Sequence, residues 1–381
     1  MLSLFCFLVV VAMSPLATTG LSQSVSPTPT IAVLGATGKL GSETMRSLID
    51  RKVPVRCLVR PSSVEKIPQD ILSSPLVEIV EGDLLAENSS DDNDAVFSDE
   101  TTTASPSLES CLQGCSGVVA CFGATRRTKF QDIFVNPEDI DPIHAKQINY
   151  RSMIALVKAC KKVNEQSENA TIRHIVRVTG KGEDPNGIFS VLLNGLGSYC
   201  KAWNYQGEVV LRTMLGNDND DGIGYTIVRP GVMADASSEK DDDSDALTEP
   251  DNLLLADNGG NDLPVTKVGY TQIAGLLTQL ALGAVAEAET SVPSLVTLAA
   301  MNPKTESGTA SNSSPKSLVD KIAALQNDRW VWVAVAIVPI PLFNGGFQCF
   351  VWISVVLLLC CCCILPYLIV PKTSKLLRLI D

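Results

Sequence analysis

Between residues 30 and 300, short apolar stretches alternate with longer amphipathic ones. The first apolar stretch, 31–34, includes β-branched residues and is uninterrupted, which is typical of a strand buried on both faces of a sheet. The segment 42–50 has apolar residues at Met45, Leu48 and Ile49, which suits a helix that packs on a sheet. The same patterns predict strands at 53–60, 76–80, 117–123, 172–179 and 225–228, helices at 108–112, 143–163, 199–215 and 272–282, and final apolar segments at 253–255 and 295–298. This alternation predicts an α/β fold with a doubly wound parallel sheet.

Polar stretches interrupt this pattern. Residues 86–107 are acidic and almost free of large apolar side chains, so we expect a disordered insertion there. The acidic runs at 218–221 and 237–245 are expected to be solvated loops. The range 301–327 begins with a stretch rich in Ser, Asn, Thr and Pro and is expected to be a linker. The main domain is therefore predicted to cover residues 30–300.

Both ends of the chain are apolar. Residues 1–21 resemble a secretory signal peptide or another targeting segment, although the usual basic start is missing, so an uncleaved anchor is an alternative. Residues 330–370 are predicted to be a membrane segment, because 349–370 alone is long enough for a transmembrane helix. One span and a hairpin of two are both compatible with this range. The basic tail at 371–381 would lie on the cytoplasmic or equivalent side.

Three regularly spaced glycines separate the first predicted strand from the first predicted helix. Gly35 allows a tight turn, Gly38 lets backbone amides approach a pyrophosphate, and Gly41 allows the helix to pack closely on the strand. The N-terminus of the helix then offers unpaired N–H groups and a partial positive charge to phosphates. The turn therefore predicts a nucleotide site, against the alternative of an ordinary strand-to-helix turn.

The end of the second predicted strand bears on the type of nucleotide. Arg60 stands where sites specific for NAD usually have a carboxylate for the ribose hydroxyls. An arginine at this point can pair with a 2′-phosphate, which favours NADP over NAD. Arg56 is a second candidate for the same role, and an Arg60 that only faces solvent is the alternative.

Composition excludes some classes of function. The net charge of −12, with acidic residues clustered in loops, argues against a nucleic-acid partner. The chain has twelve cysteines, but half of them lie in the apolar terminal segments. Cys57, Cys121 and Cys160 fall within apolar patterns typical of buried thiols. Cys111 and Cys115 have no second Cys or His pair nearby, so no metal site is predicted.

Several motifs together resemble one family. The turn at 35–41, the strand end at 58–60, the stretch 81–84 and the segment Tyr-Thr-Ile-Val-Arg-Pro-Gly at 225–231 are similar to the atypical short-chain dehydrogenases/reductases. The likeness covers residues 30–300 and is greatest to the NAD(P)H-binding, NmrA-like group, which includes plastid proteins. It implies a Rossmann-like fold and places Arg60 on the 2′-phosphate and Asp83 with Leu84 at the adenine. The cofactor-binding residues that it implies in the turn are Gly35, Thr37, Gly38, Leu40 and Gly41.

The catalytic residues of the family are matched less well. Family reductases use a Tyr and a Lys four residues later, but here Tyr199 is followed by Lys201 after two residues. Residues two apart on a helix point to different faces, so this pair cannot act in the usual way. Alignment from the Gly-Glu pair at 207–208 puts Asn204 near the position of the lysine. Thr179 matches the hydroxyl that ends the fifth strand and is a candidate for orienting a substrate carbonyl.

Two functions are consistent with these features. The first is a membrane-anchored, NADP-dependent oxidoreductase that acts on an unknown small molecule. The second is a non-catalytic NADP-binding scaffold or redox sensor for a membrane protein partner. The compartment is either a plastid membrane or a membrane of the secretory pathway, for which Asn88, Asn169 and Asn312 are glycosylation candidates.

Overall fold

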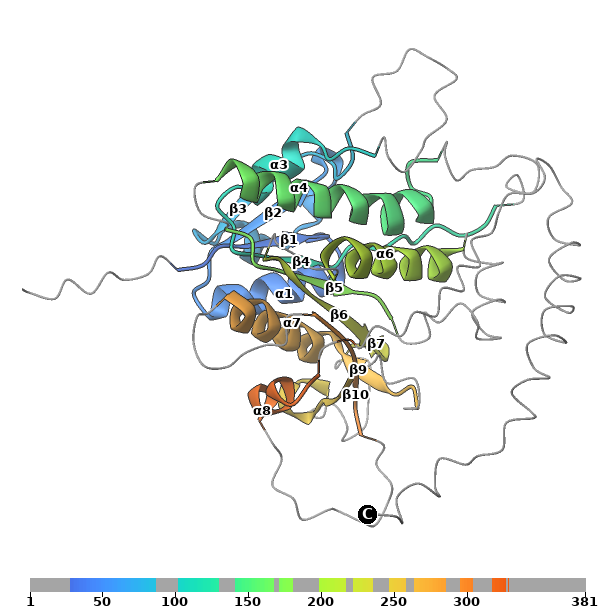
Figure 1. Cartoon of the computed structure of the whole chain (residues 1–381). Helices are drawn as coiled ribbons and strands as arrows, with labels where there is room; N and C mark the ends of the chain where they lie inside the picture. The colour runs from blue at the N-terminus through green and yellow to red at the C-terminus, as the bar shows by residue number, and fades with distance from the viewer. Residues whose placement is uncertain are drawn as a thin grey trace, which may run out of the picture.

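The computed structural model describes residues 28–86, 102–129, 141–167, 171–180, 199–216, 222–235, 247–257, 264–285, 295–303, 317–326 and 328. These residues form one large sheet with a layer of helices on each face (Figure 1). The sheet has eight strands in the order β3-β2-β1-β4-β5-β6-β10-β8. All neighbours are parallel except β8, which pairs with β10 in the antiparallel sense. The predicted doubly wound sheet is therefore confirmed, with the strand order of a Rossmann-like fold.

The strands are β1 (Ile31–Leu34), β2 (Val55–Val59), β3 (Val77–Glu81), β4 (Gly117–Ala120), β5 (His174–Val178), β6 (Gly224–Pro230), β8 (Leu254–Asp257) and β10 (Leu295–Met301). A separate parallel pair is made by β7 (Val232–Ala234) and β9 (Lys267–Gly269). The helices are α1 (Lys39–Asp50), α2 (Gln69–Leu72), α3 (Pro106–Leu112), α4 (Ser152–Gln166), α6 (Cys200–Leu215), α7 (Tyr270–Val285) and α8 (Leu318–Ala323). Shorter helical turns are η1 (Pro61–Lys66), η4 (Lys146–Arg151) and η7 (Pro250–Asn252).

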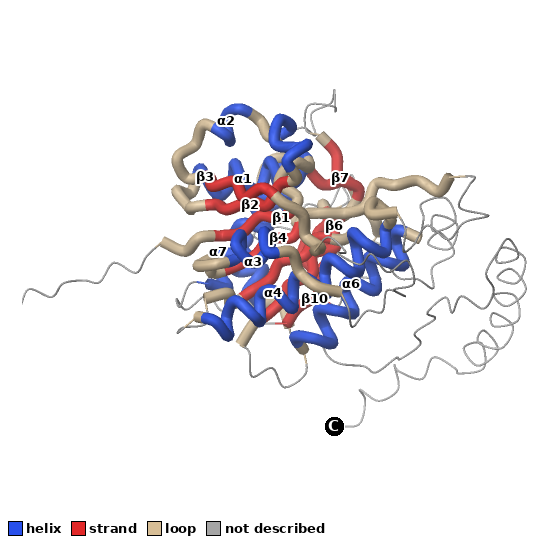
Figure 2. The backbone as a smooth tube through the Cα atoms, turned by 90° about the horizontal axis from the view of Figure 1, so that it is seen from above, coloured by secondary structure: helices blue, strands red, loops and turns tan. Residues whose placement is uncertain are grey.

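The two helix layers bury two separate cores. Helices α1, α7 and α8 cover one face of the sheet, and α3, α4 and α6 cover the other (Figures 1 and 2). Alternate residues of β1 serve alternate cores, since Ile31 and Val33 pack with α1 and α7 while Ala32 and Leu34 pack with α3 and α4. The four residues of β1 are fully buried, as expected for a central strand of a parallel sheet.

Three details differ from the sequence predictions. The predicted helix at 143–163 begins as a π-helix, η4, before α4 continues it. The end of the predicted disordered insertion is ordered, because Leu85 forms a β-bridge with Ala104 and Ser105 caps α3. The range expected to be a linker contains α8, whose Leu318 and Ile322 are buried against the main domain.

The predictions for the two ends of the chain lie outside the described residues. These are the signal or targeting segment at 1–21, the membrane segment at 330–370 and the basic tail at 371–381. Among the residues that the structure does describe, no helix is both long and apolar enough to span a bilayer.

Candidate cofactor site

The glycine turn has the geometry that its sequence predicts. Gly35 has a φ of +89°, a value that favours glycine, and a Cβ there would lie 2.6 Å from the backbone nitrogen of Phe122. A Cβ on Gly41 would collide with the backbone oxygen of Gly35. The backbone N–H of Gly38 donates to the Gly35 oxygen at 3.1 Å, which closes the turn. The glycines therefore permit β1 and the first turn of α1 to approach each other closely.

Helix α1 begins directly at this turn. Gly38 is its N-cap, and the N–H of Ser42 donates back to the Gly38 oxygen at 2.9 Å. The preceding N–H groups of the first turn have no partner within the helix, so they can bind a phosphate. The hydroxyl of Ser42 donates to the backbone oxygen of Ala36 at 3.0 Å, which stabilises the turn. Leu40 is buried in the core, so any contact that it makes with a nucleotide comes from its backbone.

Arg60 lies beside the glycine turn. Leu34 pairs with Leu58 in the register of β1 and β2, so the residues that follow these strands leave the sheet side by side. Arg60 is exposed and is the N-cap of η1. Arg56, the second candidate for the 2′-phosphate, is instead paired with Glu78 on β3 through a 2.8 Å hydrogen bond. Of the two arginines, Arg60 is thus the exposed one at the strand end next to the turn, whereas Arg56 lies within β2 and is paired with β3.

Asp83 and Leu84 follow β3 at the same edge. The N–H of Gly82 donates to the oxygen of Val59 at 3.0 Å, so this segment lies next to the end of β2. The carboxylate of Asp83 accepts a hydrogen bond from the N–H of Leu84 at 2.7 Å. Its backbone oxygen accepts from Ser105, which caps α3. The glycine turn, Arg60 and Asp83 are thus brought together along the carboxyl ends of β1, β2 and β3.

Asn149 lies near the end of β4, and no sequence pattern predicts a role for it. Its side chain is fully buried, and its oxygen accepts a hydrogen bond from the N–H of Ala124, after β4, at 2.9 Å. Its amide nitrogen lies 3.3 Å from both the backbone oxygen and the sulfur of Cys200. Asn149 therefore joins the end of β4 to the start of α6. It stands in the π-helix η4, whose extra residue per turn no hydrophobic pattern reveals.

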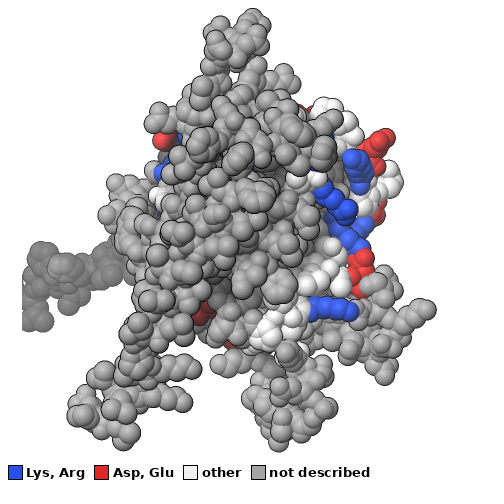
Figure 3. Space-filling view, turned by 90° about the vertical axis from the view of Figure 1, so that its right-hand side faces the viewer, with Lys and Arg blue, Asp and Glu red and all other residues white. Residues whose placement is uncertain are grey.

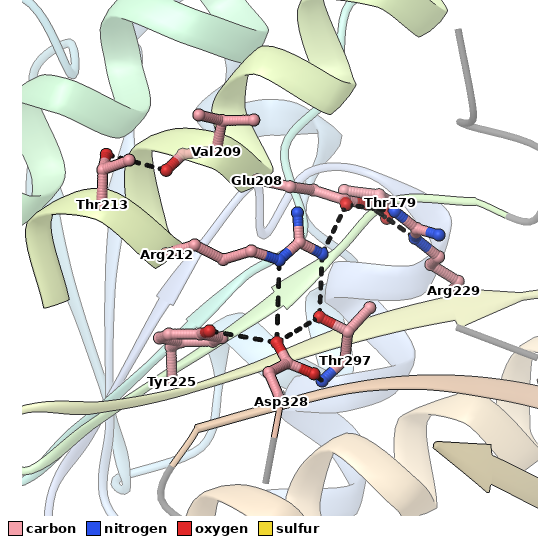
Figure 4. A network of polar contacts seen from close by, with 9 residues as sticks. All are labelled: Thr179, Glu208, Val209, Arg212, Thr213, Tyr225, Arg229, Thr297 and Asp328. Carbon is pink, nitrogen blue, oxygen red and sulfur yellow. Dashed lines mark hydrogen bonds and ion pairs between the residues drawn. The ribbon is translucent and has the colours of Figure 1, made fainter. Parts of the chain in front are cut away.

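A buried ion-pair network lies behind the carboxyl ends of β5 and β6 (Figure 4). Glu208 on α6 is fully buried and accepts hydrogen bonds from Arg229 at 3.0 Å and 2.5 Å and from Arg212 at 2.9 Å. The hydroxyl of Thr179 donates to the same carboxylate at 2.8 Å. Burial alone would raise the pKa of Glu208, but the two guanidinium groups outweigh it and lower the pKa to about 2. Glu208 is therefore a carboxylate at physiological pH.

This arrangement fixes the direction of the Thr179 hydroxyl. A threonine hydroxyl has one proton and two lone pairs, and the proton of Thr179 is engaged with Glu208. Thr179 is half-buried at the end of β5, and the lone pairs that remain on its oxygen can only accept hydrogen bonds. With its proton engaged in this way the Thr179 hydroxyl cannot also donate to a substrate carbonyl, and the carbonyl-orienting role of Thr179 stays a prediction.

The network continues toward the amino ends of β6 and β10. Asp328 accepts hydrogen bonds from the Tyr225 hydroxyl at 3.0 Å and from the backbone N–H of Thr297 at 2.8 Å. The Thr297 hydroxyl donates to Asp328 and accepts from Arg212, both at 2.8 Å. Asp328, beyond α8, is thereby linked through Arg212 to Glu208.

Tyr199 and Lys201 lie at the start of α6. Tyr199 is the N-cap of α6, is 36% exposed and has a φ of +56°, whereas Lys201 lies inside the helix. Asn204, near the position of the family lysine, accepts a hydrogen bond at 3.3 Å from the guanidinium of Arg177. Arg177 is fully buried and stacks on Phe122, with its guanidinium carbon 4.4 Å from the ring centroid. A buried cation from β5 therefore lies next to this position.

No group of three or more His, Cys, Asp or Glu side chains converges within the described part of the chain in a way that suits a metal ion. Burial raises the pKa values of the Cys57 and Cys115 thiols to about 11. Cys115 donates to the backbone oxygen of Cys111 at 3.3 Å, as a buried structural thiol does. Where described residues come into view at the right edge of Figure 3, Lys and Arg side chains lie next to Asp and Glu side chains.

The glycine turn, the strand order and the side chains at the carboxyl edge define a Rossmann-like dinucleotide-binding domain. The chain belongs to the NAD(P)H-binding family, whose model matches residues 35–253. It is 29% identical over 283 residues to Protein TIC 62, chloroplastic, of Oryza sativa subsp. japonica, covering 71% of this chain and 45% of that protein. It is 27% identical over 265 residues to Protein TIC 62, chloroplastic, of Arabidopsis thaliana, covering 66% and 33%. The chain thus spans less than half the length of these curated relatives.

Solved structures are more distant in sequence. A short-chain dehydrogenase/reductase from Veillonella parvula in complex with NADP is 16% identical, with 74% of this chain and 99% of that chain covered and a TM-score of 0.46. The oxidoreductase ylbE from Lactococcus lactis is 13% identical, with 77% and 94% covered and a TM-score of 0.45.

Proposed function

We propose that the protein binds NADP(H) along the carboxyl edge of the sheet. The diphosphate lies on the backbone of the turn formed by Gly35, Thr37, Gly38, Leu40 and Gly41. Arg60 pairs with the 2′-phosphate, and Asp83 with Leu84 borders the adenine. The observation that carries this proposal is the exposed Arg60 beside the glycine turn, since an arginine at this strand end suits NADP and a carboxylate would suit NAD.

The test is a titration of the full-length protein with NADPH and with NADH, followed by nicotinamide fluorescence. Arg60→Ala is expected to weaken NADPH binding by roughly 10- to 100-fold, because a charge-assisted hydrogen bond contributes about 1.5–3 kcal/mol. NADH binding should change little. Arg56→Ala is the matched control and should leave both affinities unchanged. Equal loss for both nucleotides in Arg60→Ala would contradict the assignment.

The bound cofactor serves one of two functions. The first is that of an NADP-dependent oxidoreductase of the atypical short-chain dehydrogenase type, with an unknown small-molecule substrate. The second is that of a non-catalytic NADP-binding scaffold or redox sensor. Two observations favour the second: the two-residue spacing of Tyr199 and Lys201 departs from the family pattern, and the Thr179 proton is engaged with Glu208. Single-turnover mixing of the NADPH complex with a panel of carbonyl and enone compounds tests this choice, since hydride transfer to any of them would favour the enzyme.

The proposed location is a plastid membrane, with a membrane protein or lipid as partner. Its support is the similarity to chloroplastic proteins and the apolar sequence at 330–370. When plastid membranes from the native host are washed with alkaline carbonate, the protein should remain in the membrane fraction. A shift in mobility after glycosidase treatment would instead indicate the secretory pathway.

A further inference from the structure

Lys39 stands inside the glycine turn, between Gly38 and Leu40, and is the first residue of α1. Its ammonium group forms an ion pair with Asp235 and lies 5.0 Å from the centroid of the Tyr270 ring. The two charged side chains are 49% and 38% exposed. The only cation within the turn is therefore held by two residues from a distant part of the chain.

The two partners of Lys39 lie at the end of the small two-stranded sheet formed by β7 and β9. Strands β7 and β9 are parallel, and Ala234 pairs with Gly269 in their register. The residues that follow, Asp235 and Tyr270, consequently leave the small sheet next to each other. Tyr270 also begins α7, which packs against α1 (Figure 1). Asp235 and Tyr270 thus lie next to the N-terminus of α1, where the diphosphate is proposed to bind.

The ammonium of Lys39 can reach either Asp235 or a phosphate bound at the glycine turn. The backbone N–H of Lys39 belongs to the first turn of α1 and is one of the groups that would contact the diphosphate. A lysine ammonium has three donors on a flexible stem, so it can turn from a neighbouring carboxylate to a phosphate at this turn. A half-exposed ion pair such as that with Asp235 adds little stability, whereas a diphosphate offers two negative charges beside the helix N-terminus.

We propose that Lys39 is a phosphate ligand of the dinucleotide and that Asp235 and Tyr270 bind its ammonium group while the dinucleotide is absent. This inference rests on the proposed function, in that it requires a dinucleotide at the turn. When the diphosphate arrives, Lys39 leaves Asp235 for the phosphate oxygens. Asp235 therefore lowers the affinity for the cofactor, and Lys39 raises it.

The exchange would also change a contact between the turn and the end of β7. β7 follows β6 directly after Gly231, whose N–H donates to the oxygen of Ala300 at 3.1 Å. Occupancy of the diphosphate position thus removes one contact that ties the glycine turn to β7 and β9. NADP and NAD have the diphosphate in common, so the effect should not depend on the 2′-phosphate.

The experiment measures dissociation constants of NADPH and NADH for the full-length protein and its variants. Asp235→Asn should bind both nucleotides about three- to tenfold more tightly, and Lys39→Gln about tenfold more weakly, as for the loss of one ionic contact. In the double variant the gain from Asp235→Asn should disappear, because no ammonium remains to be released. Glu109→Gln, which removes a surface ion pair with Lys162, is the matched control and should change neither constant.

The outcomes separate the possibilities. A gain from Asp235→Asn that persists in the Lys39→Gln background would show simple charge repulsion and overturn the inference. Weaker nucleotide binding by Asp235→Asn would also overturn the inference, since the Lys39–Asp235 ion pair would then stabilise the bound cofactor. If wild type binds neither nucleotide, the proposed function fails as well. Tyr270→Phe, which retains the ring, should behave as wild type, and melting temperatures verify that each variant is folded.

Discussion

The buried carboxylate of Glu208 makes a strong prediction about stability. An ordinary glutamate carboxyl has a pKa near 4.5, and that of Glu208 is lowered to about 2. Since a tenfold change in proton affinity corresponds to about 1.4 kcal/mol, this difference corresponds to roughly 3 kcal/mol of folding free energy. The contribution is fully present above pH 4.5 and is lost as the pH falls from about 4.5 toward about 2.

Glu208→Gln removes the charge but keeps the shape. Arg229, only 6% exposed, and Arg212 then lose their common carboxylate. Removal of one partner from a buried ion pair destabilises a protein by about 3–5 kcal/mol. For a domain of this size, about 2–4 °C of melting temperature is lost per kcal/mol, so we expect a drop of roughly 10 °C at pH 7.

The assay is thermal unfolding of wild type, Glu208→Gln and the surface control Glu109→Gln between pH 7 and pH 3. The difference between wild type and Glu208→Gln should narrow as the pH falls, while the control should follow wild type throughout. A melting temperature of Glu208→Gln equal to that of wild type at pH 7 would refute the reasoning. A difference that stays constant down to pH 3 would refute the assigned pKa.

Three further predictions concern the turn, the π-helix and the end of the domain. Gly41→Ala places a Cβ against the Gly35 oxygen and should abolish NADPH binding, as measured by fluorescence titration; retained affinity would contradict a closely packed turn. Asn149→Ala leaves the N–H of Ala124 without its partner and should lower the free energy of urea unfolding by about 1–3 kcal/mol, and an unchanged value would contradict this role. Asp328→Ala removes the acceptor for Tyr225 and should accelerate proteolysis near α8 relative to wild type; equal rates would show that the segment is held by other contacts.

The elements predicted well from the sequence are those specified by nearby residues. The strand at 31–34, its glycine turn and the following helix depend on local apolar runs and on glycines within about ten residues of each other, and the structure has them in that order. Arg60 could be placed beside the turn because the ends of parallel neighbours meet at one edge of the sheet. Whether it binds a 2′-phosphate stays a prediction.

The features that the sequence did not reveal depend on contacts between distant residues. Helix α8 is short and follows a polar stretch, and only the burial of Leu318 and Ile322 against the main core gives it a place in the domain. The antiparallel sense of β8 follows from its pairing with β10, which no local pattern encodes. The direction of the Thr179 hydroxyl depends on Glu208, which is 29 positions away. Propensity and periodicity carry no information on such pairings.

Asp328 fixes the chain to β10 in two ways, since its backbone N–H donates to Leu295 at 2.7 Å while its side chain binds Thr297. A mechanical load at Asp328 therefore reaches β10 through these two hydrogen bonds as well as α8 through the backbone. β10 lies between β6 and β8, so a force along its axis has to shear the hydrogen bonds of both neighbours together rather than unzip them one at a time. Under tension at Asp328, its own hydrogen bonds to β10 would therefore yield before the ladders on either side of β10.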